Sequence, residues 1–173
     1  PRDGLPAGQP RAGAAVADNP VALPDLTLHA LPSETVLGLL RQYCPDLSPD
    51  DAVALTGLSE GSIGDAMDFA EAGGLDLYRD MIRLLSTLPR LDIPAVHALG
   101  DRLSRANAAE SFQTFGRLLQ DWLSRLVRES AQGRLPPDIV PGERDAFAAM
   151  TTQANLAQIM EVWEKVGRLF SQA

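Results

Sequence analysis

The pattern closest to a catalytic motif in this 173-residue chain is the run Gly57-Leu58-Ser59-Glu60-Gly61. It formally matches G-x-S-x-G, the nucleophile elbow, in which a strand delivers a serine onto a strained turn ahead of a helix. The residues before it, 50–56, carry helix-start signals, and the sequence has no series of buried strands from which a sheet could be built. We therefore interpret the match as a coincidence.

The histidines and the cysteine do not form a ligand pattern either. His29 and His97 are each isolated, without a second His, Cys or acid at a spacing such as H-E-x-x-H. The single cysteine, Cys44, excludes an internal disulfide and a Cys-rich zinc site, and favours a reduced, cytoplasmic setting. A phosphate-binding G-x-x-x-x-G-K-[ST] loop is also missing. We expect no metal site, no cofactor and no catalytic residue.

One enzymatic alternative stays open, in which acids such as Asp65 and Asp68 line a pocket of a helical enzyme. A pair of carboxyl groups with raised pKa values inside a cleft would support it. Acidic residues on short helices more often cap helix ends and keep the surface hydrated. We therefore expect the chain by itself to be non-catalytic.

Charge and composition narrow the class of protein. Apolar residues make up 45% of the chain, which is enough for a core, while 23 acidic against 15 basic residues give a net charge of −8. This balance disfavours a domain that holds nucleic acid through its phosphates. Residues 46–80 contain nine acids and one base, Arg79, so the remaining chain is neutral. We interpret that stretch as a solvated acidic face, with a dedicated basic partner as the alternative. No apolar run approaches the roughly 18 residues of a membrane span.

Signals for the starts and ends of helices in the sequence predict an all-α fold. Residues 1–25 are rich in Pro and Gly without periodicity, as in a linker or disordered segment. From Pro32 onward, residues that cap helix N-termini recur, and stop signals follow them at Pro45, Gly57 and Gly73-Gly74. The predicted N-terminal residues of the first five helices are Ser33, Ser48, Ser62, Asp76 and Asp92.

Two long C-terminal segments, 108–131 and 155–172, repeat the same apolar spacing, and a Pro-rich loop and a helix near 143–152 separate them. Ion pairs at i,i+4 are expected on their flanks, from Asp121 to Arg125 and from Glu161 to Lys165. We expect both apolar seams to be buried within a helical bundle. The seam residues are Phe112, Phe115, Leu119, Trp122 and Leu126 in the first segment, and Leu156, Ile159, Trp163, Val166 and Phe170 in the second.

The change in charge near residue 75 predicts two helical units after the linker. A small acidic unit would occupy 26–74, and a neutral helical bundle would occupy 75–173.

The segment Glu60-Gly61-Ser62-Ile63-Gly64-Asp65-Ala66-Met67 resembles the sensor-2 segment in the small helical lid of clamp-loader (AAA+) ATPases. Three further runs extend the resemblance over about residues 26–173, and together they resemble the C-terminal part of the delta-prime subunits of bacterial DNA polymerase III. These runs are Leu28-His29-Ala30-Leu31-Pro32, Gly74-Leu75-Asp76-Leu77-Tyr78-Arg79 and Trp122-Leu123-Ser124-Arg125-Leu126-Val127-Arg128.

The resemblance implies a non-catalytic subunit of the clamp loader, within the polymerase III holoenzyme, a nucleotidyltransferase. Family members join an ATPase-like N-terminal domain to a helical lid and then to a C-terminal helical domain. That last domain forms a ring-shaped collar with the gamma/tau and delta subunits, which are the implied partners. No direct binding of nucleic acid by this chain is implied. The predicted boundary near residue 75 falls where lid would give way to collar.

Within this resemblance, Gly61, Ser62, Gly64 and Asp65 form a degenerate sensor-2 segment. ATP-hydrolysing relatives carry, at the position of Gly64, an arginine that reaches the nucleotide phosphates. Glycine cannot reach them, and the neighbouring Asp65 would repel a phosphate. The departure agrees with delta-prime, which in this family does not hydrolyse ATP.

Both ends of the sequence suggest a fragment or a processed chain. It opens on Pro1 rather than Met, and no nucleotide-fold domain, with the family's four-cysteine zinc site, precedes Leu26. It stops at Ala173, where the family would add another helix, so we expect a truncated collar. The alternative is a stand-alone helical adaptor or regulatory interaction domain unrelated to replication, which binding to an unrelated partner would favour.

Overall fold

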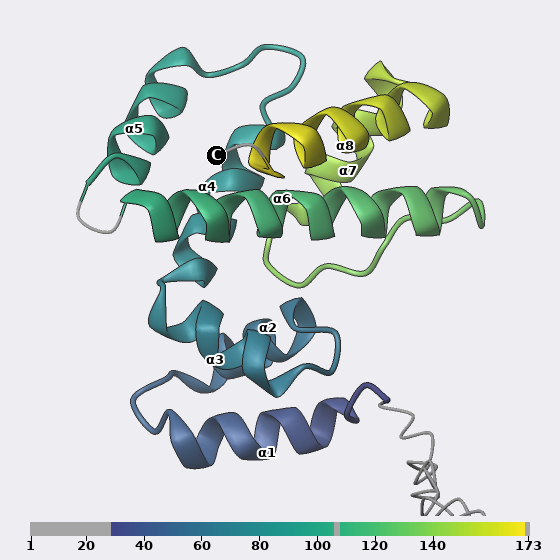
Figure 1. Ribbon diagram of the computed structural model, residues 1–173. Helices are drawn as coiled ribbons and strands as arrows, with labels where there is room; N and C mark the ends of the chain where they lie inside the picture. Colours follow the sequence, from purple (N-terminus) through teal and green to yellow (C-terminus); the bar gives the residue numbers. More distant parts are fainter. Residues whose placement is uncertain (1–28, 106–107, 172–173) are drawn as a thin grey trace, which may run out of the picture.

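The computed structural model describes residues 29–105 and 108–171, and within these ranges the chain forms eight α-helices and no strand (Figure 1). The predicted all-α fold class is confirmed. The predicted linker, 1–25, lies outside the described residues. The helices are α1 (Ser33–Tyr43), α2 (Pro49–Leu58), α3 (Ile63–Glu71), α4 (Gly74–Leu85), α5 (Ile93–Leu103), α6 (Ala108–Ser130), α7 (Glu143–Gln153) and α8 (Leu156–Ser171).

Three of the predicted helix caps are confirmed. The side chains of Ser48, Ser62 and Asp92 each accept a hydrogen bond from the backbone N–H three residues later, at 3.1–3.2 Å. These bonds satisfy amide groups that the first helical turn leaves without an intrahelical partner. Local sequence is therefore sufficient to fix where α2, α3 and α5 begin.

Three boundary predictions are wrong by a few residues. Ser33 is the first helical residue, and Pro32 stands at the cap position without a side-chain bond. Gly57 lies inside α2, which continues to Leu58. Asp76 does not cap α4, because Gly73 occupies the cap in the left-handed region, at φ 64°, where glycine carries no steric penalty.

α4 is the central element of the fold. It contacts α2 and α3 on one side of the molecule and α5, α6 and α7 on the other. Figure 1 shows α1, α2 and α3 gathered at one end, with α4 rising from them towards α6. Buried α4 residues such as Leu77, Tyr78 and Met81 belong to a core cluster that also contains residues of α1–α3 and of α5–α8. The predicted boundary near residue 75 stays a prediction.

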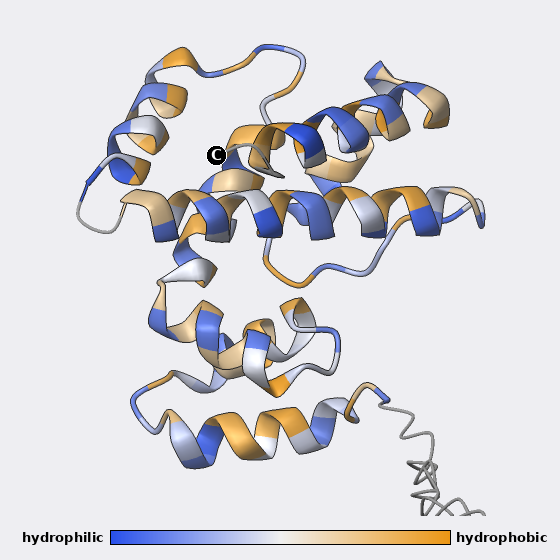
Figure 2. Cartoon of the chain, in the orientation of Figure 1, coloured by the Kyte–Doolittle hydropathy of each residue, from blue (hydrophilic) through white to orange (hydrophobic). Residues whose placement is uncertain are grey.

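α6 and α8 pack side by side as an antiparallel pair. The ring of Phe170 lies 4.6 Å, centroid to centroid, from that of Phe112 near the start of α6, whereas Trp163 reaches Ser124 further along it. Apolar and polar residues alternate along both helices, as the seams require (Figure 2). No helix in the described part of the chain combines the length and apolarity that a membrane crossing needs.

The predicted burial of the two seams is only partly right. Trp122 and Leu126 on α6 are fully buried, but Phe112 stays 37% exposed. Among the α8 side chains that the structure describes, only Ile159 is buried, and Trp163 is 42% exposed. The physical reason is that α8 packs mainly on one helix, α6, which covers a narrower stripe than the apolar face of α8.

The two predicted i,i+4 ion pairs do not form. Arg125 turns into the core and binds Glu143, while Asp121 stays at the surface. On α8, the ion pair within the described residues joins Glu164 to Arg168, at 3.8 Å, rather than Glu161 to Lys165.

A buried polar network connects α4, α6 and the loop before α7. Glu143 Oε1 accepts hydrogen bonds from Arg125 Nη1, at 2.7 Å, and from the hydroxyl of Tyr78. Glu143 Oε2 accepts from the backbone N–H of Ile139 at 2.6 Å, and Arg125 Nη2 donates to the carbonyl of Pro137 at 2.9 Å. Burial raises the pKa of the Tyr78 hydroxyl above its ordinary value. The network fixes the Pro-rich loop against the helices, because its backbone groups are partners of the ion pair.

The substitution Glu143→Gln tests this network. It keeps the size of the side chain but leaves the charge of Arg125 buried and unbalanced, so we expect the free energy of unfolding to fall by about 3–5 kcal/mol. Tyr78→Phe removes one neutral donor and keeps the ion pair, and it should cost about 1–2 kcal/mol. Urea denaturation measures both.

Arg83→Gln serves as the control, because Arg83 is exposed on α4 and its ion pair with Asp80 lies at the surface. Its effect should stay within about 0.5 kcal/mol. Equal effects of Glu143→Gln and Arg83→Gln would contradict the assigned role of the network.

Gly116 lets α8 approach α6. A methyl group at this position would collide with the ring of Phe170, so Gly116→Ala should destabilise the protein by about 1–3 kcal/mol. The matched control is Gly100→Ala on α5, where a methyl group meets nothing within 4 Å. For Gly100→Ala we expect the free energy of unfolding to rise by about 0.5–1 kcal/mol, from the higher helix propensity of alanine alone. Thermal unfolding of the two variants gives the comparison, and a stabilising Gly116→Ala would exclude the close packing described.

Candidate functional site

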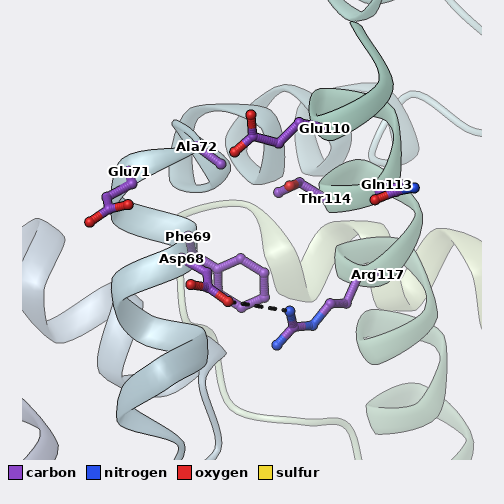
Figure 3. A pocket seen from close by; sticks show the side chains of 8 residues that line it. All are labelled: Asp68, Phe69, Glu71, Ala72, Glu110, Gln113, Thr114 and Arg117. Carbon is purple, nitrogen blue, oxygen red and sulfur yellow. Dashed lines mark ion pairs between the residues drawn. The ribbon is translucent and has the colours of Figure 1, made fainter. Parts of the chain in front are cut away.

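A cleft of about 400 Å³ opens between α3 and α6 (Figure 3). One of its walls carries Arg117, whose guanidinium pairs with Asp65, lies 4.0 Å from Asp68, and sits 5.0 Å above the ring of Phe69. The residues that line the cleft are Asp68, Phe69, Glu71, Ala72, Glu110, Gln113, Thr114 and Arg117.

The acids of the enzymatic alternative do not line this cleft together. Asp68 belongs to its wall, whereas Asp65 is not among the lining residues, and both carboxylates face the same Arg117. Arg117 thereby links α3 to α6 through charge and through its contact with Phe69. Among the described residues, no group of three His, Cys, Asp or Glu side chains is placed to hold a metal ion.

The four residues of the sensor-2-like segment lie together where α2 gives way to α3. The carbonyl of Gly61, at φ 91°, accepts a hydrogen bond from the N–H of Leu31, and a side chain here would collide with the segment before α1. Ser62 caps α3, and Asp65 pairs with Arg117. At Gly64 a Cβ would meet only the Ser62 hydroxyl, at 4.0 Å, so the position is sterically open.

The serine, histidines and cysteine considered as candidate functional residues lie in surroundings that give them no catalytic partner among the described residues. Ser59 is buried at the C-terminal end of α2, and its hydroxyl donates to the carbonyl of Thr56 at 3.1 Å. It therefore follows a helix rather than the strand that a nucleophile elbow requires. His29 and His97 are exposed, and Cys44 is half-buried against the core.

The excess of acids in residues 46–80 is largely balanced within the chain. Six of the nine carboxylates face an arginine, and three of the five arginines involved come from later helices: Arg102 on α5, and Arg117 and Arg128 on α6. The other two, Arg79 and Arg83, lie on α4 and pair with Asp51, Asp76 and Asp80. Much of the acidic stretch is thus paired with arginines of the same chain, while carboxylates such as Asp68 and Asp76 also remain largely exposed to solvent.

A groove runs along one side of the α6–α8 pair and was not predicted from the sequence. It consists of two adjoining hollows, of about 470 and 300 Å³, which share Ser124 and Trp163. The indole Nε1 of Trp163 donates to the hydroxyl of Ser124 at 2.9 Å, which holds the ring over α6 between the two hollows. The side chain of Trp163 forms a wall of both hollows, although its position in an apolar seam had predicted full burial.

The ion pair between Asp51 and Arg79 predicts a dependence of stability on pH. The Arg79 guanidinium, and then the Ser48 hydroxyl, lower the pKa of the Asp51 carboxyl below its ordinary value. Because the pKa is lower in the folded state, the contribution is present at neutral pH and is lost as the pH falls through the acidic range. Asp51→Asn should therefore lower the free energy of unfolding at pH 7. The free energy of unfolding of this variant should also decrease less on acidification than that of the unmodified protein.

Urea denaturation at a series of pH values between about 7 and 3 measures this difference, since an unperturbed aspartate, as in the unfolded chain, titrates within that range. Asp50→Asn is the matched control, because Asp50 lies in the same helical turn and forms no ion pair among the described residues. An Asp51→Asn curve parallel to that of the unmodified protein would refute the assignment.

Comparison of the chain with protein-family models, with curated proteins and with solved structures gives no match.

Proposed function

We propose that the chain is an assembly module without catalytic activity of its own, and that it contributes a lid-like and collar-type portion to a bacterial clamp loader. The gamma/tau and delta subunits are its proposed partners. The resemblance of residues 60–67 and of the later helical runs to delta-prime subunits supports the choice of assembly. A sensor-2-like segment with glycine at position 64 agrees with a subunit that does not hydrolyse nucleotide.

The observation that carries the assembly role is the exposed apolar surface of α8. Five large apolar side chains along this one helix remain more than a third exposed: Leu156, Met160, Val162, Trp163 and Leu169. Exposed apolar side chains concentrated on one element are typical of protein interaction surfaces. A helix that leaves this much apolar surface open favours a partner that covers it.

The first experiment is co-purification of the chain with the gamma/tau and delta subunits of its own host, with the mass of the complex determined by light scattering. A defined hetero-complex is the expected result. A well-folded helical monomer by circular dichroism, together with no complex, would remove the clamp-loader proposal and leave the helical adaptor as the better hypothesis.

Two substitutions on α8 test which surface assembles. Val162 and Leu169 are exposed and lie seven residues apart, so they share one face of the helix. Val162→Glu and Leu169→Glu should retain helicity and weaken complex formation by about tenfold or more, as expected when a charge enters an apolar contact. Val53→Glu on α2, which is comparably exposed, is the control and should assemble normally. Unchanged assembly of both α8 variants would contradict the role of this surface.

A further inference from the structure

The groove between α6 and α8 has an apolar half and a polar half. Val127 of α6 and Met160 and Trp163 of α8 form the walls of the apolar half, beside the exposed Arg128. Arg128 is held by Glu60, at 2.9 Å, so its charge is balanced within the chain. The apolar half therefore suits an uncharged apolar side chain, and the unbranched Met160 can adapt to its shape.

The polar half contains one carboxylate that the fold does not balance. Glu164 and Arg168 form an ion pair there, at 3.8 Å, whereas Asp121 forms none among the described residues. Three arginines lie near Asp121, but each is paired with another acid: Arg117 with Asp65, Arg125 with Glu143 and Arg128 with Glu60.

Asp121 is exposed at the surface, but neighbouring groups restrict the hydration of its carboxyl. Lost hydration, and to a smaller extent the nearby Glu60, raises the pKa of the carboxyl, while the three arginines oppose the shift. An exposed carboxylate without an ion pair among the described residues is open to an incoming cation, which would favour its charged form. Asp121 thus supplies the charge to which a partner can be complementary.

We propose that this groove binds a segment of a partner protein that carries a large apolar side chain and, about 9 Å further along, a lysine or arginine. The apolar side chain contacts Val127, Met160 and Trp163, and the cation pairs with Asp121. The spacing follows from the step of six residues from Asp121 to Val127, at about 1.5 Å of rise each. On a helical partner, residues seven apart share a face and are separated by about 10.5 Å, which is close to this spacing.

The inference rests on the proposed assembly role and deepens it by giving the chemistry of the partner segment. An anionic partner such as nucleic acid is disfavoured, because the unbalanced charge among the described groove residues is negative. The groove also differs from the Val162–Leu169 face, which lies on another flank of α8. Substitutions on one surface can therefore weaken binding there without affecting binding at the other surface.

The two tryptophans provide a direct measurement. Trp122 is fully buried, with an indole N–H that has no partner among the described residues, whereas the indole N–H of Trp163 binds Ser124 at the groove. Their two indole signals in a ¹H–¹⁵N NMR spectrum report on the core and the groove separately. The probe is a designed helical peptide with Leu and Arg seven residues apart, and the comparison peptide has Glu in place of the Arg.

We expect the Leu/Arg peptide to shift the Trp163 signal, leave the Trp122 signal in place, and bind about threefold or more tightly than the Glu peptide. Asp121→Asn should retain the fold, because it removes a carboxyl whose ionised form is disfavoured, and should abolish the preference. Glu161→Gln makes the same change of charge outside the groove and should keep the preference.

Three results would overturn the inference: no shift of the Trp163 signal, equal affinity for the two peptides, or an undiminished preference in Asp121→Asn. Broadening of the Trp163 signal with protein concentration alone would also overturn it, since the occupant would then be a second copy of the chain. If the chain forms a complex with gamma/tau and delta but gives any of these results, the proposed function stands and only the inference about the groove is rejected.

Discussion

The buried ion pair of Arg125 and Glu143 is the interaction on which the arrangement of the C-terminal helices depends. Two opposite charges taken out of water are tolerated only when their remaining hydrogen-bonding groups are satisfied. Here Tyr78 of α4 and backbone groups of the loop before α7 satisfy them. One electrostatic requirement therefore fixes four segments together, with the stacked rings of Trp122 and Phe147 beside it.

This constraint explains which features local sequence could predict. The caps at Ser48, Ser62 and Asp92 depend on residues three positions apart, so their chemistry is readable along the chain. The partner of Arg125 is not readable in this way. Asp121 stands at the favourable i,i+4 spacing on the same helix, but Glu143 lies 18 residues away and offers a fully buried carboxylate. The tertiary partner prevails over the local one, since the arginine is already drawn into the core.

The same limitation applies to the acidic stretch and to the seams. A count of charges locates an excess in 46–80 but cannot show that Arg102, Arg117 and Arg128 fold back onto it. An apolar spacing identifies the inner face of a helix but not how many neighbours cover it. Trp163 has the seam position of a core residue, yet it stays partly exposed because α8 packs mainly on α6. The groove could not be predicted because it results from this incomplete coverage.

The distribution of arginines also determines what α6 leaves for a partner. Along this helix Arg117, Arg125 and Arg128 face Asp65, Glu143 and Glu60, so each cation joins α6 to a different part of the chain. These three cations are engaged in holding the fold. Asp121, which lies between them on α6, forms no ion pair in the part of the chain that the structure describes. Asp121 lines the same hollow as the partly exposed indole of Trp163, so an unpaired charge lies next to an exposed apolar surface. The ion pairs that stabilise the fold thus also define the chemistry of the groove between α6 and α8.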